Sequence, residues 1–394
     1  WQAAFPDVFK GDNPGFDAVI GNPPYIFGEY HTSVTKPYLR GRFDIARGQY
    51  DTYWLFIEGS LSATRNGGYF SMIVPDALLA RDETVGLRNL LLASGLERVY
   101  HCGKVFAAAV SACVLTVAKN RATNLIASDV RDGVTAVVEH ICSRDRFEAD
   151  PLHRFLVHAS DREAEFLDRL DSVGTTISDV IVISRGEEVG KKDVSTSGTY
   201  PIVVGDDISR FTLAVPARFI EDFKKPRGLY EAPKVVLVKT GVRCIATVDT
   251  QGYITMQSVY NLRLRQESNS GDKSHPYQAL LSITAIINSR LVDYYIWKTF
   301  TSYKLLFPQL NQSTIESIPI PTITDLTRRG GGLVTLVERM LSLHEQVKLA
   351  RTAFERDALQ RQIDATDKQI DWLVYELYEL TGDEIRIVEE ATAR

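Results

Sequence analysis

The chain has 394 residues, enough for two or three domains with cores of their own. Its composition, 44% hydrophobic and 24% charged, is that of a globular protein, and no apolar run reaches the roughly 18–20 residues of a membrane span. The net charge of −5 argues weakly against nucleic acid as a partner, but residues 175–310 carry 17 basic and 13 acidic side chains, an excess that can form a phosphate-binding face.

The first 120 residues predict strands and helices in alternation. The run FDAVI at 16–20 predicts a buried strand, which the two prolines of Gly21-Asn22-Pro23-Pro24 must end. Residues 51–64 have apolar side chains at helical spacing with Asp51 as N-cap, and Asn66-Gly67-Gly68 is expected to stop this helix. Further elements are a buried strand at 69–74, a helix at 82–93, and strands at 97–101 and 110–118 that could form a hairpin. This alternation predicts an α/β sheet covered by helices.

The sequence changes character from about residue 175. Short apolar strands at 200–204, 234–240 and 244–255 are separated by Gly, Pro and Asp turns, and residues 277–297 favour a helix. This pattern predicts a separate α+β domain. Residues 333–380 are helical in pattern throughout and predict a helical hairpin packed on the core, with Gly330-Gly331-Gly332 as its hinge. We therefore divide the chain into residues 1–150, 151–325 and 326–394.

The tetrad Asn22-Pro23-Pro24-Tyr25 carries the chemistry. It directly follows a predicted strand, and open α/β sheets bind ligands at the carboxyl edge of their strands. An exocyclic amino group is a poor nucleophile, and a pocket activates it by accepting hydrogen bonds from its N–H groups. The Asn22 amide oxygen and the Pro23 carbonyl are suited to this role, and the prolines hold them in place beforehand. Tyr25 offers a flat face for a base that has left the duplex.

The sequence resembles the gamma-class, TaqI-like adenine-N6 DNA methyltransferases, which include large modification proteins of Type IIG, BREX and DISARM systems. GFDAVIGNPPY, NGGYFSMIVPDALL and KVFAAAVSACVLTV resemble their catalytic segments. ISRGEEVGKKD, YPIVVGDDI and FTSYKLLFPQLNQSTIESIPIP resemble their target-recognition domain, and QIDWLVYELYELTGDEIRIVE their helical tail. The resemblance implies part of a Rossmann-like class I methyltransferase sheet. It implies a role in restriction-modification or phage defence, and that Phe106 stacks on the other face of the flipped base.

The resemblance also implies S-adenosyl-L-methionine as methyl donor. The family binds it through a Gly-rich loop and an acidic residue upstream of the tetrad, and the chain starts only 21 residues before Asn22. With Trp1 as its first residue, the chain is expected to be a trimmed product or the ordered part of a longer protein. We expect the cofactor-binding segment to lie outside this chain, on an N-terminal segment or a second chain that completes the domain. The sheet should then have an open edge near residues 16–20.

Double-stranded DNA is the expected partner. Loop Lys and Arg side chains are the usual contacts to phosphate, and Gln and Asn can pair with adenine edges. The candidate DNA-binding residues of the 175–322 region are Arg185, Lys191, Lys192, Lys224, Lys225, Arg227, Lys239, Arg243, Ser302, Tyr303, Lys304, Gln309 and Asn311. Nothing in this pattern encodes a target sequence.

Other chemistries remain open. Glutamine-N5 protein methyltransferases also use NPPY, N4-cytosine methylation is a third reading, and a non-catalytic DNA-recognition or assembly subunit is a fourth. We find no PD-(D/E)xK nuclease centre, because Pro75-Asp76 lacks a D/E-x-K partner strand. Cys102, Cys113, Cys142 and Cys244 lie far apart without a C-x-x-C pair. We therefore expect no metal site and no disulfide framework, and a cytoplasmic location.

Overall fold

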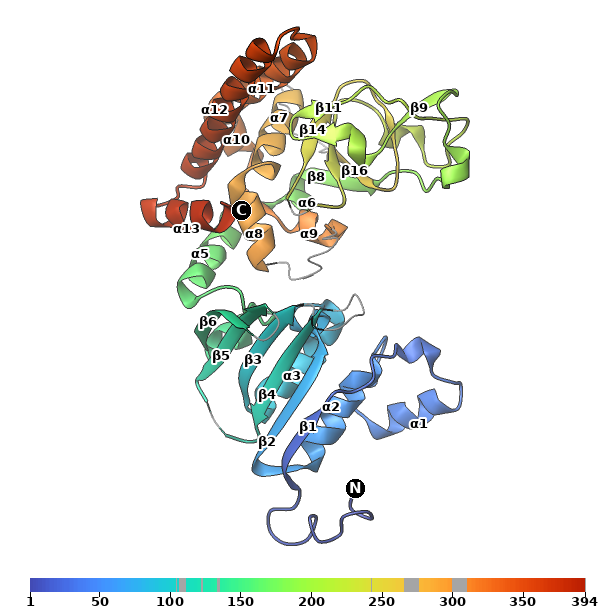
Figure 1. Cartoon of the computed structure of the whole chain (residues 1–394), viewed down its shortest axis with the longest axis vertical. Helices are drawn as coiled ribbons and strands as arrows, with labels where there is room; N and C mark the ends of the chain where they lie inside the picture. Colours follow the sequence, from blue (N-terminus) through green and yellow to red (C-terminus); the bar gives the residue numbers. More distant parts are fainter. Residues whose placement is uncertain are drawn as a thin grey trace. The chain divides into compact units, whose positions relative to one another are not determined.

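The computed structural model describes the chain except for residues 104, 106–110, 122, 133–134, 242, 266–275, 300–309 and 394. Two compact units form, the first comprising Trp1–Glu165 and the second Phe166–Trp297 together with the C-terminal helices. Figure 1 shows the sheet of the first unit and the smaller sheets and helices of the second. The predicted α/β class is confirmed, and each unit is described separately.

A six-stranded sheet in the order β1-β2-β4-β3-β5-β6 organises the first unit. Its strands are β1 (Phe16–Gly21), β2 (Thr64–Pro75), β3 (Leu96–Gly103), β4 (Ala112–Ala118), β5 (Leu125–Asp132) and β6 (Thr135–Ser143). β1 runs parallel to β2 and β3 parallel to β5, whereas the other pairs are antiparallel. β3 and β4 form the predicted hairpin. The sheet has two strands, β5 and β6, that were not predicted from the sequence.

The expectation that residues 16–20 are buried was wrong. β1 is the edge strand of the sheet, and Ile20 is 84% exposed. An open edge at 16–20 had been predicted from the resemblance, and the strand order confirms it. An apolar run predicts a strand but does not distinguish an edge strand from an interior one, because both use β-favouring side chains.

The helix predicted at residues 51–64 is confirmed as α2 (Thr52–Ala63), but the residues expected to stop it have another role. α2 stops before Asn66-Gly67-Gly68, and these three residues belong to β2. The pairing of β1 with β2 shifts register there, since Phe16 faces Thr64 and Ala18 faces Tyr69. Gly67 has φ +72, a conformation that glycine adopts without strain. The glycines therefore form a bulge in the strand and are not a helix stop.

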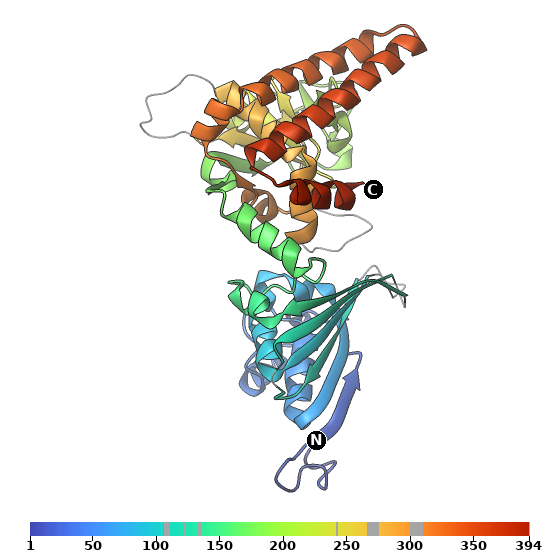
Figure 2. The same ribbon diagram turned by 90° about the vertical axis from the view of Figure 1, so that its left-hand side faces the viewer.

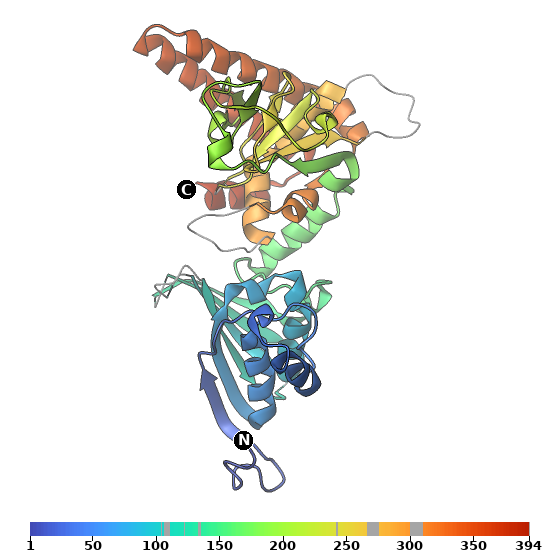
Figure 3. The ribbon, with the colours of Figure 1, turned by 90° about the vertical axis from the view of Figure 1, so that its right-hand side faces the viewer.

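Helices cover one face of this sheet. α2 begins at Asp51, whose side chain accepts from the Tyr53 N–H as the predicted N-cap, and α3 spans Val85–Ser94. Figures 2 and 3 show both helices on the same side of the strands. Their apolar faces pack on alternate residues of β2 and β4, such as Phe70, Met72 and Leu115. α1 (Thr35–Arg42) lies between β1 and α2 in sequence, and α4 (Arg144–Ala149) and α5 (Asp161–Asp171) follow the sheet.

The second unit contains several small sheets. Antiparallel strands in the order β14-β13-β16-β8 form the largest one, and the strands β12-β9-β15 form a second. The bounds are β7 (Thr175–Thr176), β8 (Ile181–Arg185), β9 (Tyr200–Val203), β10 (Ile208–Ser209), β11 (Thr212–Leu213), β12 (Phe219–Ile220), β13 (Lys234–Val238), β14 (Ala246–Asp249), β15 (Ile254–Thr255), β16 (Val259–Leu264) and β17 (Pro319–Ile320). The strands predicted at 200–204 and 234–240 are confirmed. The segment predicted at 244–255 contains two strands, β14 and β15.

Helices complete the second unit. They are α6 (Ile177–Val180), α7 (Pro276–Ile287), α8 (Arg290–Thr299), α9 (Gln312–Glu316), α10 (Ile323–Arg329), α11 (Gly331–Leu349), α12 (Ala353–Leu377) and α13 (Gly382–Thr392). α11 and α12 pack together as the predicted hairpin, and α11 also contacts α7. α12 and α13 each begin with a capping box, Thr352 with Glu355 and Thr381 with Glu384. The glycines 330–332 lie at the junction of α10 and α11.

Candidate functional site

The tetrad lies at the carboxyl end of β1. β1 ends at Gly21, so Asn22 is the first residue beyond the strand, and its side chain is exposed. Pro23 is buried and Pro24 is exposed. The ring of Tyr25 is half-buried and meets Tyr53 of α2 edge-on, with 6.1 Å between the ring centroids. A turn with two fixed φ angles, anchored by one buried proline, presents the Asn22 amide at the edge of the sheet.

The hydroxyl of Tyr25 connects the tetrad to the neighbouring strand. It lies 3.3 Å from Asn22 Oδ1 and 3.1 Å from the carbonyl oxygen of Ile73 in β2. Burial, with smaller contributions from Cys113 and Asp51, raises the pKa of Tyr25 to about 12. The hydroxyl therefore keeps its proton at neutral pH, and these two oxygens share its single donor proton. An amide oxygen has two lone pairs, so Asn22 can still accept one further hydrogen bond.

Titratable side chains gather at the same edge of the sheet. Asp76 follows the end of β2, and its Oδ2 lies 3.2 Å from Nε2 of His101 near the end of β3. Both residues are buried. Asp51 caps α2 next to the tetrad, and burial raises its pKa. From the sequence, Asp76 was weighed only as a nuclease ligand, and His101 was not among the predicted site residues. Their positions directly beyond or near the ends of two strands were the signal that could have identified them.

The predicted DNA-contacting cations of the second unit fall into three overlapping groups. Lys192 and Arg227 are exposed, and Lys224 is exposed with its backbone N–H bonded to Glu187. In contrast, Lys225 Nζ donates to the carbonyls of Arg185 and Gly186 at 2.7 and 2.8 Å. Arg243 donates to the carbonyl of Thr392, at the end of α13. The side chains of Lys225 and Arg243 therefore form hydrogen bonds within the second unit, in addition to any role toward a ligand.

A third set surrounds the end of β8. Arg185 donates to the Gln257 carbonyl at 3.1 Å and lies 3.5 Å from Glu188. Burial and the nearby charge of Arg185 lower the pKa of Lys239. Arg185, Lys225 and Lys239 thus lie near one another, with Glu188 as an acidic neighbour of Arg185.

Several predicted residues are not placed. Phe106, Ser302, Tyr303, Lys304 and Gln309 lie outside the described residues, as does the side chain of Lys191. Asn311 is exposed and precedes α9 without a side-chain capping bond. Among the described residues no group of three or more His, Cys, Asp or Glu side chains is arranged to hold a metal ion. No helix in the described part of the chain is both long and apolar enough to cross a membrane.

Comparisons with known proteins identify two segments. Residues 1–106 match the family described as Eco57I restriction-modification methylase, and residues 185–320 match the TaqI-like C-terminal specificity domain. The chain is 25% identical to the Type II methyltransferase M.TthHB8I of Thermus thermophilus, over 82% of this chain and 76% of that protein. It is 34% identical to the restriction enzyme and methyltransferase RM.Eco57I of Escherichia coli, over 21% of this chain and 9% of that protein.

A solved structure shares the fold. The Type IIL restriction-modification enzyme MmeI, determined in complex with DNA, superposes with a TM-score of 0.57 at 9% identity, over 93% of this chain and 55% of that chain. The chain thus spans three quarters of the Thermus protein and about half of MmeI. It combines a segment similar to restriction-modification methylases with a segment similar to TaqI-like specificity domains.

Proposed function

We propose that this protein acts in a restriction-modification system as a DNA methyltransferase that modifies N6 of an adenine flipped out of the duplex. The observation that carries the proposal is the tetrad beyond β1, where Tyr25 holds an exposed Asn22 amide oxygen. The similarity of residues 1–106 to restriction-modification methylases supports it. The similarity of residues 185–320 to specificity domains favours DNA over a protein glutamine as substrate.

The proposed chemistry uses two acceptors. Asn22 Oδ1 and the Pro23 carbonyl accept hydrogen bonds from the two N–H groups of the target amine. The nitrogen then moves toward tetrahedral geometry, and its lone pair becomes available for attack. Because these oxygens are fixed before the reaction, little reorganisation is needed in the transition state. The face of Tyr25 stacks on the base and limits its rotation.

S-adenosyl-L-methionine would supply the electrophilic methyl group. The residues at this edge fit the acceptor side of the reaction, since they are an amide oxygen, a carbonyl and an aromatic ring. They do not form a cradle for the nucleoside part of the donor. We propose that this part is bound by a segment other than the described tetrad region, and we assign no residue to it.

The second unit is proposed to read the DNA target. Its cations Lys192, Lys224 and Arg227 are exposed, and we propose that they contact phosphates, which position a protein on the duplex without reading sequence. Asn311 is the described residue that could contact a base edge.

Methylation sequencing tests the proposal. Genomic DNA from cells that express the complete gene should carry N6-methyladenine at one recurring sequence, and cells with an Asn22→Ala copy should lack it. N4-methylcytosine at that sequence would replace the adenine assignment. Unmodified DNA, with methylated glutamine in a cellular protein, would overturn the DNA assignment altogether.

A further inference from the structure

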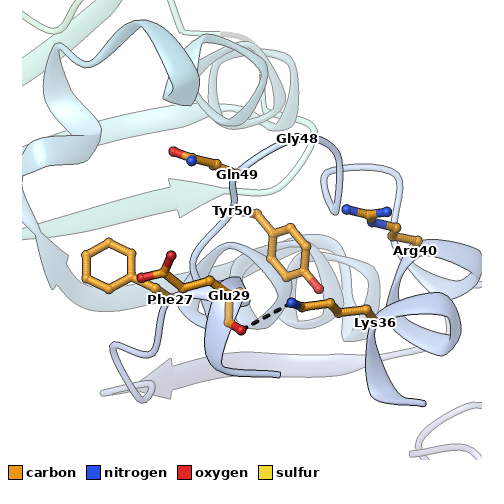
Figure 4. A pocket seen from close by; sticks show the side chains of 8 residues that line it. Phe27, Glu29, Lys36, Arg40, Gly48, Gln49 and Tyr50 are labelled. Atoms are coloured by element: carbon orange, nitrogen blue, oxygen red, sulfur yellow. Dashed lines mark hydrogen bonds between the residues drawn. The ribbon is translucent and has the colours of Figure 1, made fainter. Parts of the chain in front are cut away.

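A preformed pocket lies in the segment between the tetrad and α2. It has a volume of about 340 Å³ and is lined by Phe27, Gly28, Glu29, Lys36, Arg40, Gly48, Gln49 and Tyr50. Figure 4 shows Lys36 and Arg40 extending from α1 toward the ring of Tyr50, with Phe27 and Glu29 opposite. The first lining residue, Phe27, is two residues beyond Tyr25. This volume is at the lower end of the range for pockets that bind small organic groups.

The base of this pocket is rigid. Gly28 N donates to the carbonyl of Tyr50 at 2.7 Å, and Thr52 N donates to the carbonyl of Ile26 at 2.9 Å. Phe27 and Asp51 form an isolated β-bridge between these two bonds. Tyr50 is buried under Gly28, where a Cβ atom would lie 2.9 Å from the Tyr50 carbonyl oxygen. His31 contacts the Tyr50 hydroxyl and Thr52 Oγ1 at 3.4 and 2.9 Å.

The wall formed by α1 is basic. Lys36 Nζ donates to the carbonyl of Glu29 at 3.1 Å, which leaves two of its three protons for a ligand. The guanidinium of Arg40 is exposed and has no hydrogen-bond or ion-pair partner in the part of the chain that the structure describes. Glu29 adds one carboxylate to the lining, so the two cations still outnumber it.

The segment that forms the pocket also carries exposed aromatic rings, of which Phe27 lines the pocket itself. Phe27 is 53% exposed, Tyr30 72% and Tyr38 69%, although aromatic side chains are normally buried. All three belong to residues 26–42, the segment that follows the tetrad. Exposed rings next to unpaired cations are the combination that binds nucleic-acid strands, where the rings meet bases and the cations meet phosphates.

We propose that this pocket binds one nucleotide of the DNA strand beside the flipped base, with its phosphate between Lys36 and Arg40 and its base or sugar against Phe27. The inference rests on the proposed function, and it adds a DNA contact on the catalytic unit to those expected on the second unit. A DNA strand whose base is bound at the tetrad must continue beyond it on both sides. The pocket holds the first cationic side chains that follow the tetrad in sequence. The charge of the wall complements a phosphate, which favours DNA over an apolar protein surface as occupant.

Salt-dependent binding tests the proposal. The full-length protein is titrated with a short fluorescein-labelled duplex of mixed sequence at several salt concentrations. Each phosphate contact contributes a slope of about −0.9 to a plot of log K against log salt. Arg40→Gln should reduce the steepness of this slope by about 0.9 and weaken binding about tenfold at low salt. Arg42→Gln is the matched control, because Arg42 is exposed on the same helix and does not line the pocket. It should leave the slope unchanged.

The outcomes separate the inference from the function on which it rests. Failure of the wild-type protein to bind the duplex would contradict the proposed function itself. Normal binding with an unaltered slope in Arg40→Gln would overturn only the pocket assignment, as would equal losses in both variants. AMP serves as a probe for a free nucleotide. Calorimetric binding of AMP that depends on Arg40, with duplex binding unaffected, would overturn the DNA strand as occupant.

Discussion

The Tyr25 hydroxyl lies 3.3 Å from the side-chain oxygen of Asn22 and 3.1 Å from the Ile73 carbonyl, so one side chain of the tetrad positions another. In the proposed reaction this contact gives Tyr25 a second role beside stacking. The ring would offer a face to the base, and the hydroxyl would fix the oxygen that accepts from the target amine. The two roles can be separated by mutation.

Tyr25→Phe keeps the ring and removes the donor to Asn22. We expect the rate of methyl transfer in single turnover to fall about tenfold, since a hydrogen bond of this kind contributes roughly 0.5–1.5 kcal/mol. Flipping of a 2-aminopurine target, followed by fluorescence, should remain close to wild type. Tyr25→Ala should lose both effects and show reduced flipping, because base stacking contributes about 1–3 kcal/mol. Equal rates for Tyr25→Phe and wild type would remove the positioning role.

Asn22→Ala removes the proposed acceptor itself. The rate should decrease about 100–1000-fold, the usual effect of deleting one preorganised catalytic hydrogen bond. DNA affinity, measured by fluorescence anisotropy, should stay nearly constant because the side chain is small and lies at the sheet edge. Asn124→Ala, an exposed asparagine of the same unit, is the control. Wild-type methylation by the complete enzyme with Asn22→Ala would show that Asn22 is not the acceptor.

Asp293 should make the second unit less stable as the pH rises. Its Oδ1 accepts from Cys244 N at 2.9 Å, and burial raises the pKa of Asp293 to about 7, partly offset by this bond, Arg210 and Arg243. The unfolded carboxyl has a pKa of about 3.9. Between these two pKa values the folded state holds a proton that the unfolded state has lost. The contribution of Asp293 to the free energy of unfolding therefore falls as the pH rises from about 4 to 7.

The pH effect is measured as a difference between variants. Asp293→Asn can still accept from Cys244 but never ionises. Urea unfolding should show it more stable than wild type at pH 8, by on the order of 1 kcal/mol or more, and nearly equal at about pH 4, where the carboxyl is still largely protonated in both states. Asp168→Asn, an exposed acid on α5, should show no such trend. A constant difference between Asp293→Asn and wild type at both pH values would contradict the assignment.

Lys234 at the start of β13 forms a buried ion pair. It is 0% exposed, and its Nζ donates to Asp249 and to the carbonyls of Tyr230 and Tyr253. Lys234→Met should destabilise the second unit by on the order of 3 kcal/mol, because a buried carboxylate loses its countercharge. Adding Asp249→Asn should restore part of the loss in the same denaturation experiment. A double variant less stable than Lys234→Met would indicate that the charge pair is not the cause.

In the first unit, local sequence patterns predicted where helices and strands occur better than they predicted which of their residues are buried. Asp51 was identified as an N-cap because its side chain acts on residues next to it in sequence. The exposure of Ile20 depends on which strand pairs with β1, and no local pattern contains that information. β5 was not predicted because Ser128 and Asp129, both buried, interrupt the apolar alternation of its sequence.

The partners of charged side chains could not be predicted from local sequence patterns either. Lys225 and Arg243 were expected to face DNA, yet they donate to carbonyls within their own unit. Arg88 is fully buried in α3, where it donates to the carbonyls of Leu78, Arg81 and Leu152. A basic residue in a sequence indicates a donor, but the location of its acceptors is a property of the folded chain. The pocket of residues 27–50 was not predicted, because Phe27, Lys36 and Arg40 lie 10 or more positions before Tyr50 in sequence and are brought to it only by folding.

The backbone pairing of residues 26–28 with residues 50–52 has a consequence for how this region can vary. Its ends are held side by side, so the stretch between them is a closed loop, whose second half is also held because Ile45 N donates to Glu58 and Ala46 is buried in the core. The entropic cost of closing such a loop grows only with the logarithm of its length. Short insertions at the exposed residues 32–34 should therefore leave Asn22 and the start of α2 in register. The length of the loop can change at this point without displacing the tetrad.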